Sequence, residues 1–282
     1  MKYGAKSIWD KNNIQDKLNR GADGIEIQLK TPSPISEMGQ KLPAEQIKMI
    51  QTIHMPIVSN TEQFSITTRK GFRTLIDLTY MLTTLRDSEA GKGLREDLHI
   101  VCHYMPNPND DDNITYENAV LMLRMLAAQE KSLVFCIENT TGGSIGRVWD
   151  YENVQFVKDI GAANVKTCLD TCHALMVETN EDGISLGEAF RLNAGICAHV
   201  HMCNAIDCGD GYGNKKGHGV PFSSAKDRDL QRIIELYRHY EYDADIVYEV
   251  REDDYLNCEN YSLIKEQVGD SLINKKQNKK AS

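Results

Sequence analysis

Short apolar runs alternate with longer amphipathic ones along the whole chain. Runs such as "GIEIQLK" (24–30), "SLVFCIEN" (132–139) and "ICAHVHMC" (196–203) are nearly continuous in apolar residues. This pattern is typical of parallel strands that are buried on both faces. The strands predicted in this way span residues 2–8, 24–30, 52–58, 97–104, 132–139, 164–170, 196–203 and 244–250.

Amphipathic stretches follow each of these strands. In residues 70–86, for example, Phe72, Leu75, Ile76, Thr79 and Leu82 recur at helical spacing. The predicted helices span residues 11–22, 44–51, 70–86, 115–130, 150–160, 185–194, 225–240 and 260–274. Strand–helix units repeated in this order predict an α/β fold, a single-domain (β/α)8 TIM barrel over residues 1–273. An open doubly wound sheet is the alternative, and the Lys-rich residues 274–282 are predicted to be a disordered tail.

Composition narrows the class of protein. The chain has 282 residues, of which 41% are hydrophobic and 26% charged, which is ordinary for a globular protein. Its net charge of −9 argues against a broad basic surface for nucleic acid, but not against a local basic groove. No signal pattern and no apolar stretch of about 18 residues is present, so a membrane span is not expected. The oligomeric state is left open.

Cysteine usage predicts the compartment. Cys102, Cys136, Cys168 and Cys197 fall inside or beside strand-like runs, where a free thiol behaves as a small hydrophobe. No Cys-x-x-Cys zinc pair occurs in the sequence. We therefore expect free thiols and a reducing, cytoplasmic location.

The ends of the predicted strands carry the candidate chemistry. In a TIM barrel, catalytic groups collect at the C-terminal ends of the strands. Six of the eight histidines and three acidic residues map to this rim: His54, His103, Glu138, Asp170, His173, His199, His201, His218 and Glu249.

Singly, each of these residues has a simpler explanation. A strand-end histidine is more often a hydrogen-bonded structural residue, and Glu249 could pair with Arg251 or Arg147. His199 and His201 point to the same side of their strand, and we expect His201 to be the ligand and His199 to lie deeper. His99 and His239 fit no strand end and are expected to be structural or surface residues.

Together, the rim residues indicate a metal centre. Imidazole and carboxylate are ligands that zinc, manganese and iron favour. The set is larger than one ion needs, and a carboxylate such as Glu138 can bridge two ions. Neighbouring metals can activate a water and stabilise a phosphoryl transition state.

Six segments carry a family resemblance. They are "IHMP" (53–56), "CHYMP" (102–106), "IENTTGGSIG" (137–146), "LDTCHA" (169–174), "HMCNA" (201–205) and "YEV" (248–250). The chain resembles endonuclease IV, the family 2 apurinic/apyrimidinic endonucleases, within the wider xylose isomerase-like TIM barrels. "IENTTGG" and "LDTCHA" are the specific segments.

The resemblance implies a site of two or three divalent ions, with zinc expected and manganese as the alternative. It implies that Glu138 bridges a first and a second ion. The first ion would be held by His54, His103 and Glu138, the second by Glu138, Asp170, His201 and Glu249, and the third by His173 and His218.

The sequence departs from the family pattern at three places. Lys216 stands where the family has an Asp two residues before His218, so Asp207, Asp210 or the charge of Lys216 itself are the alternatives for the third site. Lys6 stands where the first strand usually ends in a histidine. "KTPSPISEMG" (30–39) replaces the Arg-rich loop that the family uses on DNA.

Two functions of different classes follow from the resemblance. The first is a hydrolase that cleaves the phosphodiester 5′ to an abasic site in DNA, with Glu138 and Glu249 at its catalytic centre and Arg147, Lys215 and Lys216 on the backbone. The alternative is a sugar isomerase or epimerase with one ion at Glu138, Asp170, His201 and Glu249. In that family the two glutamates also move the proton beside the carbonyl.

The two functions differ in what they require of the rim histidines. The isomerase has no use for His54 and His103 as ligands, so their presence favours the hydrolase. A barrel that holds metal but has lost its substrate is a third interpretation.

Overall fold

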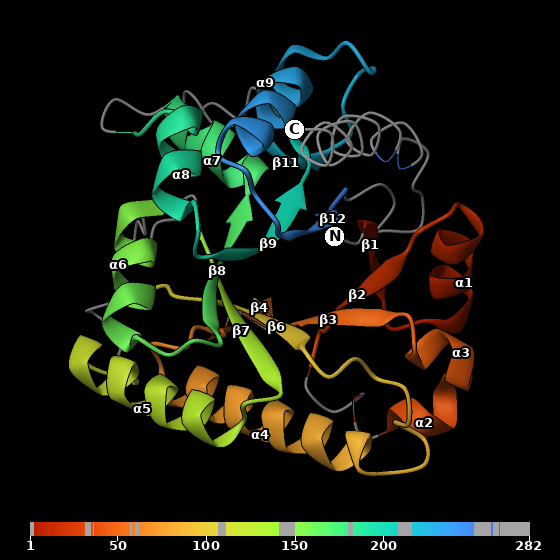
Figure 1. Ribbon diagram of the computed structural model, residues 1–282. Coiled ribbons are helices and arrows are strands. Elements are labelled where there is room, and N and C mark those ends of the chain that lie inside the picture. Colours follow the sequence, from red (N-terminus) through yellow and green to blue (C-terminus); the bar gives the residue numbers. More distant parts are fainter. Residues whose placement is uncertain are drawn as a thin grey trace, which may run out of the picture.

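Eight parallel strands close into a barrel in the computed structural model of the chain (Figure 1). The structure describes residues 3–31, 35, 37–56, 58–59, 62–106, 111–140, 150–179, 183–207, 216–250, 261 and 265. Around the barrel each strand pairs in parallel with its sequence neighbours, and the first strand pairs with the last. The order is β1 (Tyr3–Ile8), β2 (Gly24–Gln28), β3 (Ile50–His54), β6 (Leu98–His103), β7 (Leu133–Glu138), β8 (Val165–Asp170), β9 (Cys197–Met202) and β12 (Asp245–Tyr248).

This closure confirms the predicted TIM barrel and excludes the open sheet. Helices surround the barrel, and most of them follow a strand as the sequence pattern predicts (Figure 1). They are α1 (Lys11–Asn19), α2 (Met38–Lys41), α3 (Ala44–Ile47), α4 (Arg69–Arg86), α5 (Tyr116–Gln129), α6 (Asp150–Ile160), α7 (Thr171–Glu178), α8 (Leu186–Asn193) and α9 (Arg228–His239).

Side-chain caps fix where several helices begin. Thr68, Thr115 and Ser185 each accept a hydrogen bond from a backbone N–H in the first turn of α4, α5 and α8. Helix α4 buries Phe72 and Leu75 as its spacing predicts. Ile76, which was expected on the same face, is 40% exposed, because the buried stripe of α4 continues through Leu75, Leu78, Thr79 and Leu82 instead.

Several elements differ from the sequence prediction. Helix α7 begins directly after β8, where the sequence analysis placed no helix before residue 185. Strand β3 begins at Ile50, which shortens the predicted helix 44–51 to α3. Two small hairpins were also not predicted: β4 (Val58–Ser59) with β5 (Glu62–Gln63), and β10 (Asn204–Asp207) with β11 (Lys216–Val220). The predicted rim residue His218 therefore lies in a strand of the second hairpin.

The C-terminal prediction is tested only at two residues. Tyr261 and Lys265 are helical, and the Tyr261 hydroxyl donates to the backbone carbonyl of Tyr3 at 2.7 Å. The rest of the predicted helix 260–274, the boundary at residue 273 and the tail lie outside the described residues. Within the part of the chain that is described, no helix is both long and apolar enough to cross a membrane.

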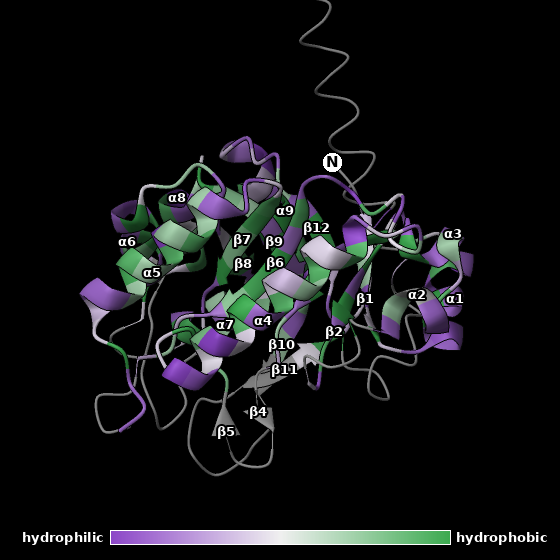
Figure 2. Cartoon of the chain, turned by 90° about the horizontal axis from the view of Figure 1, so that it is seen from below, coloured by the Kyte–Doolittle hydropathy of each residue, from purple (hydrophilic) through white to green (hydrophobic). Residues whose placement is uncertain are grey.

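The main apolar core lies between the barrel and its helices. It runs through residues on both, such as Ile25, Leu75 and Phe156, and hydrophobic colour dominates the central strands while the helices carry both colours (Figure 2). Inside the barrel, Val101, Cys136 and Cys168 form a separate small apolar cluster. Every cysteine in the described segments is a free thiol, and those expected in strands lie there.

Candidate functional site

The C-terminal ends of the barrel strands bring the predicted rim residues together. His54, His103, Glu138 and Asp170 each end a strand, and Glu249 directly follows β12. His201 lies one residue before the end of β9, and His173 lies in the first turn of α7. The strand-end side chains are each no more than 2% exposed, so their charges are held away from water.

Glu138 is the hub of this group. Its Oε2 lies 3.0 Å from Nε2 of His54 and 2.8 Å from Nε2 of His103. Its Oε1 lies 3.2 Å from Nδ1 of His201 and 3.5 Å from Nδ1 of His173. A carboxylate with imidazoles on both oxygens has the arrangement expected of a bridging ligand.

Four donors form what we call the mouth cluster: Glu138, Asp170, His201 and Glu249. One ligand atom of each lies within 4.8 Å of the others. Nδ1 of His201 is 2.8 Å from Oε2 of Glu249 and 3.8 Å from Oδ2 of Asp170. Three carboxylates and one imidazole at this spacing suit a divalent ion such as zinc or manganese.

A second donor group shares Glu138. Ligand atoms of His54, His103 and Glu138 also lie within 4.8 Å of one another. The Nδ1–H of His54 donates to the carbonyl oxygen of Met55 at 2.7 Å, which directs Nε2 toward Glu138. The structure thus brings together the residues expected for the first and second ions.

The loop after β7 holds Asp170 and His173 in place. The Asp170 backbone N–H donates to Oδ1 of Asn139 at 2.6 Å, and Nδ2 of Asn139 donates back to the Asp170 carbonyl at 3.2 Å. The Asp170 side chain caps α7 by accepting the His173 N–H at 2.8 Å. Nδ1 of His173 donates to the Asn139 carbonyl at 2.7 Å. The "IEN" and "LDTCH" segments therefore support each other.

Two buried charges beneath the mouth were not assigned to the site from the sequence. Lys6 is 1% exposed and Glu26 is fully buried. Nζ of Lys6 lies 3.1 Å from Oε1 of Glu26 and 2.8 Å from Oε1 of Glu249. The signal for Glu26 was available, because it is a charged residue between Ile25 and Ile27 in a predicted buried strand.

Glu138 and Glu249 are ionised despite their burial. Burial by itself raises the pKa of each glutamate, but for Glu138 the charges of His103 and His201 hold the pKa well below its usual value. Lys6 and His201 do the same for the pKa of Glu249. Anionic groups around His201 outweigh its burial and raise its pKa well above the ordinary value. Both carboxylates are therefore in the deprotonated form that binds a metal ion.

His199 and His99 continue the polar chain into the barrel. Nε2 of His199 lies 2.8 Å from Oε2 of Glu26, and its Nδ1 lies 3.3 Å from Nδ1 of His99. His199 is deeper than His201, as expected. His99 is a buried interior residue, and burial followed by the charge of His199 lowers its pKa to about 3.

Several predicted residues are beyond what the structure describes. Arg147, Lys215 and Asp210 lie outside the described residues. Lys216 and His218 are in β11, with Lys216 opposite Asp207 in the hairpin register, but the description does not extend to their side chains. The third ion and the DNA-contacting cations therefore stay predictions.

Several solved structures that are similar to this chain are sugar epimerases. The chain is similar to an L-ribulose 3-epimerase (15% identity, TM-score 0.65, covering 99% of this chain and 97% of that one). It is also similar to a D-psicose 3-epimerase solved in the presence of D-fructose (19% identity, TM-score 0.61, covering 97% of each chain). A third structure is the IOLI protein with a bound zinc atom (14% identity, TM-score 0.62, covering 97% of each chain). At these identities the likeness establishes the fold alone.

The comparisons support the resemblance to the xylose isomerase-like TIM barrels rather than the narrower resemblance to endonuclease IV. None of these three structures is an endonuclease IV, and no curated protein matches the chain. The family model described as xylose isomerase-like TIM barrel matches residues 19–268. The chain therefore belongs to the xylose isomerase-like TIM barrel family.

Proposed function

We propose that the protein is a metal-dependent isomerase or epimerase of a small keto sugar. The observation that carries this proposal is the mouth cluster, in which three carboxylates and one imidazole converge from four neighbouring strand ends. This donor set would also suit the second ion of the hydrolase, so the preference over the hydrolase, which the sequence analysis placed first, rests on the sugar epimerases among the similar folds. The epimerases among the similar folds support the same substrate class.

The mouth residues fit the ion that such a reaction uses. Glu138, Asp170, His201 and Glu249 would hold it, and carboxylate and imidazole are ligands that a divalent cation accepts. When bound, the ion would supply a Lewis acid that polarises a substrate carbonyl. Zinc is our first expectation and manganese the alternative, since the donor set accepts both.

Glu138 and Glu249 are the proposed proton carriers. Both are ionised at neutral pH, because the cations beside them lower their pKa, so each can accept a proton from the carbon next to the carbonyl. They project from β7 and from the residue after β12 and contact the same Nδ1 of His201, at 3.2 and 2.8 Å. Two bases from different strands are what an epimerisation with removal and return of a proton requires.

The hydrolase remains the second candidate because of one observation. His54 and His103 both contact Oε2 of Glu138, and the three make a second group able to hold an ion. An isomerase with one ion does not need them as ligands. In the hydrolase, a metal-activated water would attack the DNA phosphodiester, and Arg147, Lys215 and Lys216 would contact the backbone.

One pair of assays separates the two candidates. The purified protein, loaded with zinc or manganese, is given a panel of ketoses and ketose phosphates, and separately a duplex with one abasic site. We expect ketose turnover that disappears with a strong chelator. Cleavage of the abasic duplex to a 3′ hydroxyl, with no ketose turnover, would overturn the proposal and support the hydrolase.

A further inference from the structure

Glu26 lies between two histidines beneath the mouth cluster. Its Oε2 is 2.8 Å from Nε2 of His199 and 3.1 Å from Nε2 of His201, and its Oε1 is 3.0 Å from the same His201 nitrogen. Lys6, its neighbour across the β1–β2 pairing, lies 3.1 Å from Oε1. A buried carboxylate with these partners has one well-defined position.

The two ring nitrogens of His201 therefore face different groups. Nδ1 faces Glu249 and Glu138, at 2.8 and 3.2 Å, while Nε2 faces Glu26. When a carboxylate accepts the N–H of one ring nitrogen, it fixes the tautomer and orientation of the imidazole and leaves the other nitrogen free to bind a metal.

We propose that Glu26 is a positioning residue that accepts the Nε2–H of His201 and thereby presents Nδ1 to the ion at the mouth. Lys6 completes the arrangement, because its ammonium contacts both Glu26 and the mouth residue Glu249, at 3.1 and 2.8 Å. One buried lysine thus links the carboxylate that orients the ligand histidine to a carboxylate of the cluster. This inference rests on the proposed metal site.

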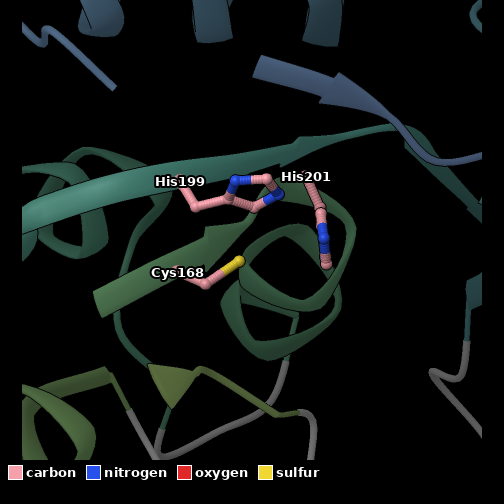
Figure 3. A group of neighbouring side chains, drawn as sticks. All are labelled: Cys168, His199 and His201. Atoms are coloured by element: carbon pink, nitrogen blue, oxygen red, sulfur yellow. The ribbon is translucent and has the colours of Figure 1, made fainter. Parts of the chain in front are cut away.

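A metal site deeper in the barrel is the alternative explanation for the position of His201. Cys168, His199 and His201 each have a ligand atom within 4.8 Å of the others, so they could hold a thiophilic ion deeper in the barrel (Figure 3). Both ring nitrogens of His199, however, already have protein partners, Glu26 at Nε2 and His99 at Nδ1. An ion bound to His199 would have to displace Glu26 or His99, so hydrogen bonding is the better explanation of the geometry.

The test compares Glu26→Gln with the loss of a partly buried barrel carboxylate. Asp245→Asn removes a barrel carboxylate that pairs with Arg95 at 2.6 Å and belongs to β12, away from the mouth cluster. Cobalt and zinc affinities of the full chain are measured by competition with a chelator. Glu26→Gln should weaken binding by about 10- to 100-fold, the usual effect of losing such a partner, and Asp245→Asn should not. If Glu26→Gln does not fold by circular dichroism, Glu26→Asp, which keeps the charge but withdraws the oxygens, should show a smaller loss.

Nitrogen NMR of histidine-labelled protein reads the positioning directly. His201, assigned from a His201→Gln variant, should carry its proton on Nε2 in the metal-loaded wild type and lose this preference in Glu26→Gln. Affinity and tautomer both unchanged in Glu26→Gln would overturn the inference alone. Wild-type protein that binds no ion would overturn the proposed function as well. A sulfur-to-cobalt charge-transfer band that disappears in Cys168→Ser would place the ion at the deeper group and also contradict the inference.

Discussion

Metal binding to this protein should strengthen as the pH rises. Burial by itself lowers the pKa of His201. The nearby anionic groups raise this pKa by more than burial lowers it; they are Cys168 as a thiolate, Glu26, Glu249 and Glu138. Of these, the carboxylates matter at neutral pH, because burial raises the pKa of the Cys168 thiol well above its usual value and keeps it protonated. His201 is therefore an imidazolium in the metal-free protein.

The size of this pH dependence follows from the single proton that His201 loses when the ion binds. An ion can use Nδ1 of His201 only after that proton leaves, whereas Glu138 and Glu249 are already ionised and release none. Below the pKa of His201, the affinity should therefore rise about tenfold per pH unit, or about 1.4 kcal/mol, and it should become constant above that pKa. His54, whose pKa is lowered by burial and by Lys6, is neutral and adds no proton of its own.

Titration calorimetry counts this proton. The protein is titrated with zinc at one neutral pH in buffers that differ in their heat of ionisation, and the slope gives the protons released per ion. We expect a value near one for the mouth site. His239→Ala, which changes an exposed histidine on α9, should leave the count unchanged. Tight binding with no proton released would refute the reasoning, because His201 would then be neutral before the ion arrives.

Three further predictions concern catalysis and stability. Glu138→Gln and Glu249→Gln should each lower ketose turnover by about 10²- to 10⁴-fold while circular dichroism shows a folded protein, because each removes a proton carrier. Burial lowers the pKa of His99 from 6.5 to about 3, so the unfolded chain binds a proton that the folded protein does not, and stability should fall as the pH drops from 6.5 towards 3. Urea unfolding should show that this group lowers the free energy of unfolding by up to about 1.4 kcal/mol for each pH unit of acidification. The His99→Gln variant should lack this contribution, and the same dependence on pH in both proteins would contradict the prediction. On α5, Leu123→Ala should lower the free energy of unfolding in urea by about 2–5 kcal/mol, because Leu123 is fully buried. Leu121→Ala should lower it far less, because Leu121 is 50% exposed, and equal losses would be inconsistent with the packing.

The barrel and most of its rim could be predicted because both depend on local patterns. Apolar runs and their strand-end residues specify which side chains meet once parallel strands close, and so the sequence alone predicts that His103, Glu138 and Asp170 lie together. Helix α7 was missed because Asp170 is both the last strand residue and the cap of the helix, which leaves no turn sequence between the two elements.

The residues beneath the rim could not be assigned in the same way. Lys6 and Glu26 take their meaning from a pairing between β1 and β2 and from contacts with Glu249 and His201 across the barrel. Their strand patterns show that they are buried, but not which charge each one meets. The substrate class is even harder to predict from the sequence, since the same fold and a similar donor set serve different reactions.

Exchange of a ketose proton with solvent is the most direct test of the central claim. The metal-loaded protein is incubated with a ketose panel in D2O, and proton NMR follows the hydrogen on the carbon next to the carbonyl. If Glu138 and Glu249 remove and return that hydrogen, the signal should decay in the wild type, and chelator, Glu138→Gln or Glu249→Gln should each slow the decay strongly. Metal bound at Glu138, Asp170, His201 and Glu249 with no deuterium entering any ketose or ketose phosphate of the panel would contradict the proposed isomerase or epimerase.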